Sequence, residues 1–145
     1  MIADLNDLTA DFIDTSIEAR EWAWSELRVR YNSPQCIVLR YKGDITGVVF
    51  YTVDGDEIIN SLLLTKPPWG IAGTDIENGA ELAAKNADTI LTHLFDTVGA
   101  KRVSVETSSG NKRMQKMWKR HTGQSFTPSG AGYEGYLTRE QYLNR

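Results

Sequence analysis

The chain has 145 residues, a length that corresponds to one domain with room for a sizeable hydrophobic core. Hydrophobic residues account for 41% of it, charged residues for 24%, and the formal net charge is −3. These values are ordinary for a globular protein, and the acidic balance excludes a bulk attraction to nucleic acid or anionic membranes. The single cysteine, Cys36, excludes an internal disulfide, and we expect a buried, reduced thiol there.

No apolar run approaches the ~20 residues of a membrane-spanning helix. The N-terminal stretch 1–12 is acidic and lacks the basic region of a signal peptide. We therefore expect a cytoplasmic protein with no membrane partner, folded as a single domain over residues 1–145. The sequence shows no cluster with metal-ligand spacing, so no metal site is predicted.

The first predicted element is helical and covers residues 4–30, as one bent helix or two short ones. Its apolar positions recur among acidic residues, and they are Leu5, Leu8, Phe12, Ile13, Ile17, Trp22 and Trp24. Asn32-Ser33-Pro34 then interrupts the pattern.

Three strands follow, over residues 35–41, 45–53 and 57–65. Short turns join them, Lys42-Gly43-Asp44 and Asp54-Gly55-Asp56, so we expect an antiparallel meander. The third strand ends in Leu62-Leu63-Leu64, which is apolar on both faces and therefore predicted to be central and covered on both sides.

A long helix is predicted from about Gly79 to Val98, with Gly99 as its C-terminal cap. The chain then re-enters a strand over residues 101–107, where Val103 and Val105 alternate with polar residues. A strand, a helix and a strand in this order form a right-handed crossover, so the two strands should be parallel.

A second amphipathic helix begins after Asn111, followed by two short strands over residues 125–127 and 133–137. Residues 128–132 would form the loop between them, and a last helical turn would begin at Thr138. The helix and its surroundings carry a characteristic series of residues: Asn111, Met114, Met117, Trp118, Arg120, Gly123 and Phe126.

In spacing, this series resembles the last strand–helix segment of the GNAT (Gcn5-related N-acetyltransferase) family. Together with the element order, the resemblance extends over residues 35–137. It implies an α/β fold with a mixed, mostly antiparallel sheet of about six strands, flanked by helices, with a central parallel pair. The family's first strand would be short or absent here.

The resemblance implies that acetyl-CoA lies where the two parallel strands separate near Leu64. Its pantetheine arm would pair with the strand end at Leu63, Leu64 and Thr65, and Asn111 and Trp118 would flank it. Its pyrophosphate would meet the N-terminus of the long helix. The family's loop, Gln/Arg-x-x-Gly-x-Gly/Ala, has two imperfect counterparts. One contains Gly70 and Ala72, and the other contains Gly79 and Ala80.

Acetyl transfer needs a base for the amine proton and an acid for the CoA thiolate. Glu57 and Glu106 are the candidate bases, although each is also explained as a solvated carboxylate at a strand end. Trp118 occupies the position of the Tyr that acts as the general acid in the family. An indole N–H cannot act as an acid near neutral pH. Tyr133, or alternatively Tyr136, is the candidate replacement.

Two functions remain open from the sequence. The first is an acetyl-CoA-dependent N-acetyltransferase acting on an amine of a small molecule or protein. The second is a catalytically degenerate GNAT-like structural or interaction protein, for example a phage virion protein, which would then be located in the virion. A nucleic-acid substrate is disfavoured by the net charge. An exposed strand edge and the many Trp and Tyr residues are compatible with a homodimer or a larger assembly.

Overall fold

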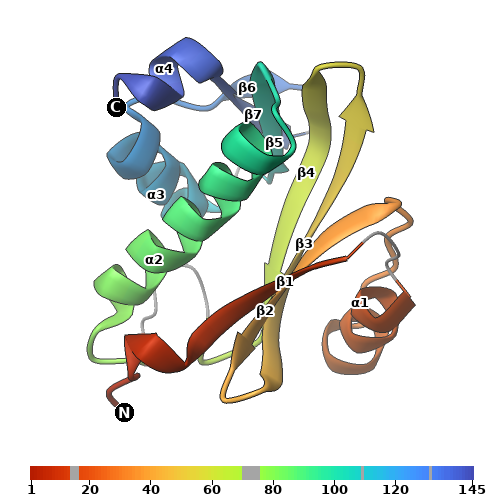
Figure 1. Ribbon diagram of the computed structural model, residues 1–145, viewed down its shortest axis with the longest axis vertical. Helices are drawn as coiled ribbons and strands as arrows, with labels where there is room; N and C mark the ends of the chain where they lie inside the picture. Colours follow the sequence, from red (N-terminus) through yellow and green to blue (C-terminus); the bar gives the residue numbers. More distant parts are fainter. Residues whose placement is uncertain (14–16, 70–75, 109, 131) are drawn as a thin grey trace.

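The computed structural model describes residues 1–13, 17–69, 76–108, 110–130 and 132–145 (Figure 1). In chain order its elements are a 3-10 turn η1 (Leu5–Asp7), β1 (Leu8–Ile13), α1 (Ile17–Trp22), a π-helical turn η2 (Ala23–Leu27), β2 (Gln35–Tyr41), β3 (Asp44–Asp54), β4 (Glu57–Thr65), α2 (Gly79–Thr92), a π-helical turn η3 (His93–Thr97), β5 (Arg102–Thr107), α3 (Lys112–Thr122), β6 (Thr127–Ser129), β7 (Gly132–Thr138) and α4 (Arg139–Leu143).

The described strands form one seven-stranded sheet in the order β1-β2-β3-β4-β5-β7-β6. Every neighbouring pair is antiparallel except β4 and β5, which are parallel. The predicted mixed sheet with a central parallel pair is confirmed, and the crossover through α2 accounts for it. None of the described helices is long and apolar enough to cross a membrane.

The helical prediction for residues 4–30 was wrong over its first half. Residues 8–13 form the edge strand β1, paired with β2 from Leu8↔Tyr41 to Ile13↔Cys36. The acidic residue Asp11 that suggested a helix face instead pairs with Arg40 at 2.6 Å. Because the β2 backbone offers a ladder of partners, tertiary pairing overrides the local helical pattern here.

The last hairpin also differs from the prediction. Pro128 and Ser129, expected in a loop, belong to β6 and pair with Tyr133 and Gly132. Pro128 is tolerated there because β6 is the other edge of the sheet, where a ladder N–H is not required.

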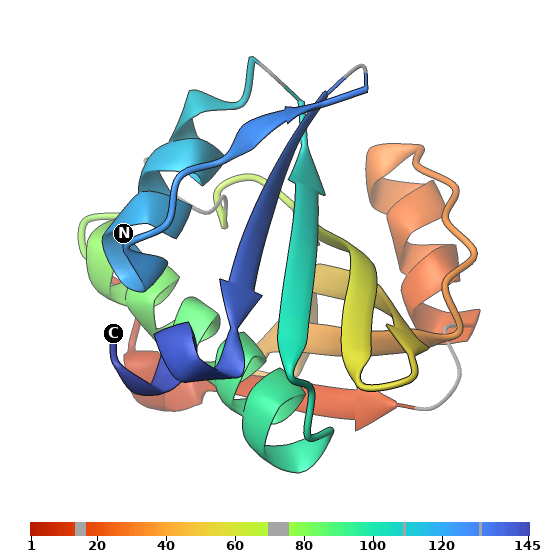
Figure 2. The ribbon, with the colours of Figure 1, turned by 90° about the horizontal axis from the view of Figure 1, so that it is seen from above.

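Helices cover both faces of the sheet, as Figure 2 shows: α2, α3 and α4 lie on one side and α1 on the other. The strand β2 accordingly is apolar on both faces. Ile37 and Leu39 join the core beneath α2 and α3, whereas Cys36 and Val38 join the core beneath α1. The main core therefore lies between the sheet and the α2–α3 pair.

Gly135 in β7 leaves room for the side chains of Phe126 and Trp118, which pack directly against the sheet. A Cβ atom at this position would lie 2.0 Å from the Phe126 ring and 2.8 Å from Nε1 of Trp118. We predict that Gly135→Ala lowers the free energy of unfolding by about 1–3 kcal/mol, as overpacking does. Urea denaturation measures this. Gly110→Ala is the control, because nothing lies within 4 Å of its Cβ position, and equal losses for the two variants would contradict the prediction.

Candidate active site

The parallel strands β4 and β5 run together only over their first part. Their last paired positions are Ser61 and Val105, after a break in register that contains Asn60. Asn60 has a φ of 54°, in the left-handed region that side chains other than glycine rarely adopt. Beyond this point β4 continues along β3 from Leu62 to Thr65, while β5 continues along β7. The two strands therefore separate in a V from Ser61 onward. The separation was expected near Leu64, three residues later in β4.

Tyr31 holds the irregular backbone at the opening. Its hydroxyl donates a hydrogen bond to the carbonyl of Asn60 at 2.7 Å, and its ring packs against Phe50 with centroids 5.3 Å apart. Burial raises the pKa of Tyr31, the Ser33 hydrogen bond opposes this, and the Glu106 carboxylate adds to it. The phenol therefore stays protonated at neutral pH and remains a donor.

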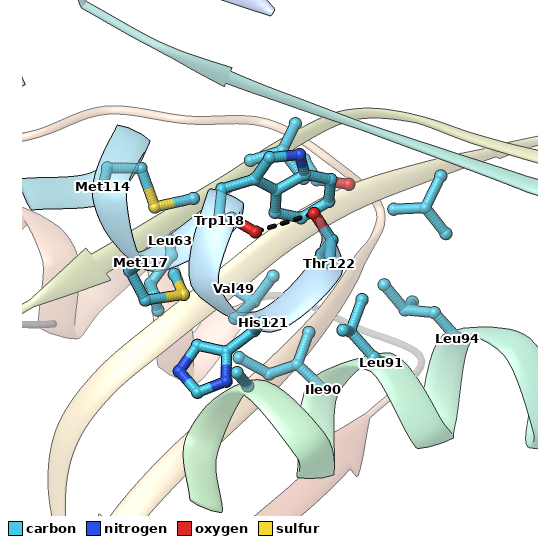
Figure 3. Close-up of a pocket in the computed structure, with 14 residues that line it drawn as sticks. Val49, Leu63, Ile90, Leu91, Leu94, Met114, Met117, Trp118, His121 and Thr122 are labelled. Atoms are coloured by element: carbon cyan, nitrogen blue, oxygen red, sulfur yellow. Dashed lines mark hydrogen bonds between the residues drawn. The ribbon is translucent and has the colours of Figure 1, made fainter. Parts of the chain in front are cut away.

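An apolar cavity of about 50 Å³ lies on the α2–α3 side of the opening. Figure 3 shows side chains from α2 and α3 converging on it, with His121 at one side. Burial lowers the pKa of His121, so its imidazole is neutral at pH 7. The lining consists of Val49, Ser61, Leu63, Ala87, Ile90, Leu91, Leu94, Val103, Val105, Met114, Met117, Trp118, His121 and Thr122.

Two polar atoms in this lining are buried and have no hydrogen-bond partner among the described residues, Ser61 Oγ and Trp118 Nε1. Register places Ser61 beside Val105 and Val105 beside Gly135, against which Nε1 of Trp118 lies. The two donors thus flank Val105 in one row across three strands. Leaving a buried donor unsatisfied costs about 1–3 kcal/mol.

The chemical character of this lining suits the arm of an acyl-CoA, although a cavity of about 50 Å³ holds only a small part of such an arm. Such an arm is an apolar chain that carries amide and thioester oxygens, and those oxygens accept hydrogen bonds. Ser61 and Trp118 could each donate one from within an otherwise apolar wall. Leu63 also belongs to the wall, whereas the neighbouring Leu64 packs into the core on the α1 side. Thr65 ends the strand opposite Gly47.

A second hollow, of about 390 Å³, opens between the end of β5 and the β6–β7 hairpin. It is lined by Leu62, Glu106, Thr107, Ser108, Ser129, Gly132, Tyr133 and Glu134. The structure thus brings together Glu106 and Tyr133, two of the three predicted catalytic residues. Ser129 donates to Glu134 at 3.1 Å, and a hydrogen bond to Glu134 raises the pKa of Tyr136. With two carboxylates and no basic group in its described lining, the hollow suits a cationic amine.

Glu57 does not join this group. It stands at the first residue of β4, beside the start of β5, where Arg102 pairs with it at 3.5 Å. The Arg102 guanidinium also lies 4.0 Å from the ring centroid of Tyr136. Glu57 is therefore an ion-paired carboxylate at the end of the sheet opposite the V.

The start of α2 retains free backbone donors. Gly79, its first residue, is buried and Ala80 is exposed. The preceding residue, Asn78, makes no side-chain cap. Its amide instead accepts from Ala3 N at 3.0 Å and donates to Ala3 O at 2.7 Å. The N–H groups of Gly79 and Leu82 donate to the carbonyls of Ile76 and Asn78, each at 3.1 Å, so those of Ala80 and Glu81 remain available to an anion. The other predicted loop, with Gly70 and Ala72, lies outside the described residues.

The charged side chains near the start of α2 are engaged in other contacts and would contribute little to binding a phosphate there. Lys85 donates to the carbonyl of Leu5 and so holds the N-terminal segment. Glu77 pairs with the N-terminal ammonium group at 3.9 Å. Asn111 is likewise engaged, because its side chain caps α3 by accepting from Met114 N at 3.1 Å. Within the described residues, a phosphate at α2 would therefore be contacted by backbone groups.

Sequence reasoning missed three residues of the site: Tyr31, Ser61 and Glu134. A signal existed for Ser61, because the pair Asn60-Ser61 interrupts an apolar strand and marks a bulge. Tyr31 and Glu134 carried none, since they reach the opening only through the fold.

No protein-family model matches the sequence, and no curated protein matches it. Solved structures do. Mutant forms of SpeG, a spermidine/spermine N-acetyltransferase from Vibrio cholerae, are 11% identical with a TM-score of 0.67, over 97% of this chain and 98% of that chain. A dodecameric V. cholerae spermidine N-acetyltransferase is 12% identical with a TM-score of 0.64, over 97% and 98%.

A third match is the Campylobacter jejuni N-acetyltransferase PseH in complex with acetyl coenzyme A. It is 13% identical with a TM-score of 0.55, over 72% of this chain and 67% of that chain. The chain has the GNAT fold. At 11% to 13% identity, the structural similarity establishes the fold of this GNAT-fold chain and leaves its activity open.

The absence of a hydrogen-bond partner for the Ser61 hydroxyl can be tested by comparison with Ser104, a second buried serine. Ser104 is similarly buried, but its hydroxyl donates to the carbonyl of Ile58 at 3.4 Å. We predict that Ser104→Ala lowers the free energy of unfolding by about 1 kcal/mol, whereas Ser61→Ala leaves it unchanged or slightly higher. Urea denaturation of both variants without ligand measures the difference. An equal loss in Ser61→Ala would show that this hydroxyl has a partner.

Proposed function

We propose that the protein is an N-acetyltransferase that uses acetyl-CoA to acetylate an amine of a small molecule or protein. The observation that carries this proposal is the pair of unpartnered donors, Ser61 Oγ and Trp118 Nε1, in the apolar lining where β4 and β5 part. Without a ligand, burying both donors lowers the stability of the protein, because neither donor forms a hydrogen bond that would offset its loss of contact with water. The likeness to N-acetyltransferases of the same fold agrees with the proposal.

On the donor side, the chain orients the acyl arm. The free backbone edge of residues 62–65 is a ready partner for the arm's amides, and Leu63 packs against its methylene groups. The N–H group of Ala80 would face the phosphates, and Gly79, whose own N–H donates to the carbonyl of Ile76, would let the backbone approach them closely. Acetyl-CoA supplies an acyl carbon that an amine can attack.

On the acceptor side, the amine would lie in the hollow lined by Glu106, Tyr133 and Glu134. The ammonium group would first release one proton to solvent, so that the neutral amine can attack the acyl carbon. Glu106 would take the second proton as the C–N bond forms and the C–S bond breaks, and the Tyr133 hydroxyl would give a proton to the leaving thiolate. Trp118 donates a hydrogen bond without giving up its proton.

A thermal-shift titration with acetyl-CoA, followed by an assay of thiol release with amines, tests this function. Acetyl-CoA at a hundred times its dissociation constant should add about 2.7 kcal/mol of stability. Ser61→Ala should reduce this stabilisation without lowering the stability of the free protein. Absence of binding at millimolar acetyl-CoA would overturn the proposal in favour of a structural or interaction protein.

Removal of the proposed base gives a sharper test. We predict that Glu106→Gln lowers kcat by about 10²-fold or more, because a general base contributes that much. Glu57→Gln separates the two sequence candidates, since it should retain activity if Glu106 is the base. Glu140→Gln, on the exposed side of α4, is the control for loss of a carboxylate. Loss of activity in Glu57→Gln alone would reverse the assignment.

The proposed phosphate position predicts opposite effects on stability and binding. Ala80→Glu adds an exposed carboxylate in the first turn of α2, where the helix dipole favours it by about 0.3–1 kcal/mol. The same carboxylate would repel a diphosphate, so we expect acetyl-CoA to bind about tenfold more weakly. Calorimetry measures the affinity, with Asn144→Asp near the C-terminus as control. Unchanged affinity would mean that the phosphates lie elsewhere.

A further inference from the structure

We propose that the amine acceptor also carries an anionic group, a carboxylate or a phosphate, and that Arg28 and Arg30 hold this group beside Trp24. The inference rests on the proposed function and specifies its substrate class. An acceptor of this kind is an amino acid, a peptide that ends in a carboxy-terminal lysine, or a phosphorylated amine, rather than a simple polyamine.

The two arginines lie on the segment that follows η2, on the face of the sheet opposite α2 and α3 (Figure 2). Both stack on the exposed ring of Trp24. The guanidinium carbon of Arg30 is 3.8 Å from the ring centroid, and that of Arg28 is 5.5 Å from it. A groove of about 440 Å³ runs beside Arg30 and Trp24. Its lining is Ile17, Arg20, Glu21, Trp24, Arg30, Tyr31 and Asn32, so it carries two guanidinium groups and one carboxylate.

Neither arginine forms an ion pair within the part of the chain that the structure describes. The nearby carboxylate of Glu26 is instead paired with Lys66 at 3.3 Å. A guanidinium presents a planar fork of donors that matches a carboxylate or phosphate, and stacking on an aromatic ring fixes its orientation in advance. Two oriented guanidinium groups without a counter-ion therefore form a ready anion site.

The backbone supports the same reading. Arg28 has a φ of 56°, and its N–H bonds to the carbonyls of Ala23 and Trp24. A residue other than glycine in this conformation costs of order 1 kcal/mol, and such positions cluster at functional sites. The turn holds the Arg28 side chain back over Trp24 instead of letting the helix continue.

Tyr31 connects this site to the proposed active site. It follows Arg30 directly in the chain and lines the arginine groove. Its hydroxyl reaches the carbonyl of Asn60 at the V, next to the hollow with Glu106 and Glu134. An acceptor lying along Tyr31 would thus meet carboxylates at one end and guanidinium groups at the other. This polarity matches a molecule with an ammonium group at one end and an anion at the other.

Two matched ligand pairs test the inference: L-lysine against cadaverine, which lacks only the carboxylate, and ethanolamine phosphate against ethanolamine. Binding is measured by NMR titration of the full chain, and turnover by thiol release from acetyl-CoA. We expect the anionic member of at least one pair to bind about tenfold or more tightly than its partner. The pair that shows the preference tells carboxylate from phosphate recognition.

The variants Arg28→Gln and Arg30→Gln should abolish that preference while leaving binding of cadaverine and ethanolamine unchanged. Lys101→Gln, an exposed cation at the far end of the sheet, controls for loss of positive charge. Equal or tighter binding of cadaverine and ethanolamine, no binding of any of the four ligands, or a preference that survives in the arginine variants would overturn the inference.

Different experimental outcomes would contradict the anion site and the proposed acetyltransferase function. Acetylation of cadaverine with no preference for an anion keeps the transferase and overturns the anion site. An arginine-dependent preference in binding, with no acetyl transfer to any amine, keeps the anion site and overturns the transferase.

Discussion

The left-handed backbone at Asn60, fixed by the Tyr31 hydroxyl, is the constraint on which the rest of the site depends. If β4 and β5 stayed paired along their whole length, their backbone groups would satisfy one another and leave no edge for a ligand. The break in register ends the pairing at Ser61 and Val105. Tyr31 stabilises the irregular backbone by donating a hydrogen bond to the carbonyl of Asn60.

The opening divides the molecule into two chemically different sides. Beneath α2 and α3 the lining is apolar, with two buried donors, Ser61 and Trp118, that lack acceptors. At the end of β5 the lining is polar and carries Glu106 and Glu134. The uncharged acyl arm and the charged amine of the proposed reaction would each find a suitable environment here, and the parted strand pair would let the two meet across the sheet.

The sequence was most informative where the local pattern and the tertiary environment agree. Strand β4 was predicted with its observed bounds, and Asn111 caps α3 as its position before the helix suggested. The pattern misled at β1, because an edge strand with Asp11 facing solvent looks like an amphipathic helix until Arg40 and the β2 backbone are present. Of the proposed catalytic residues, Glu106 and Tyr133 line the same hollow. Glu57 is also a carboxylate at the end of a strand, but it lies at the opposite end of the sheet.

The sequence by itself determined the order of the elements from β2 to β7 and the crossover that makes β4 and β5 parallel. These follow from apolar periodicity, turn residues and chain connectivity, which are properties of neighbouring residues. Only the tertiary structure decided where the parallel strands part, which donors remain unpartnered, and that Tyr31 joins an arginine groove to the opening. Those features depend on register and on contacts between residues far apart in the chain, such as Tyr31 with Asn60 and Trp118 with Gly135, which no local pattern encodes.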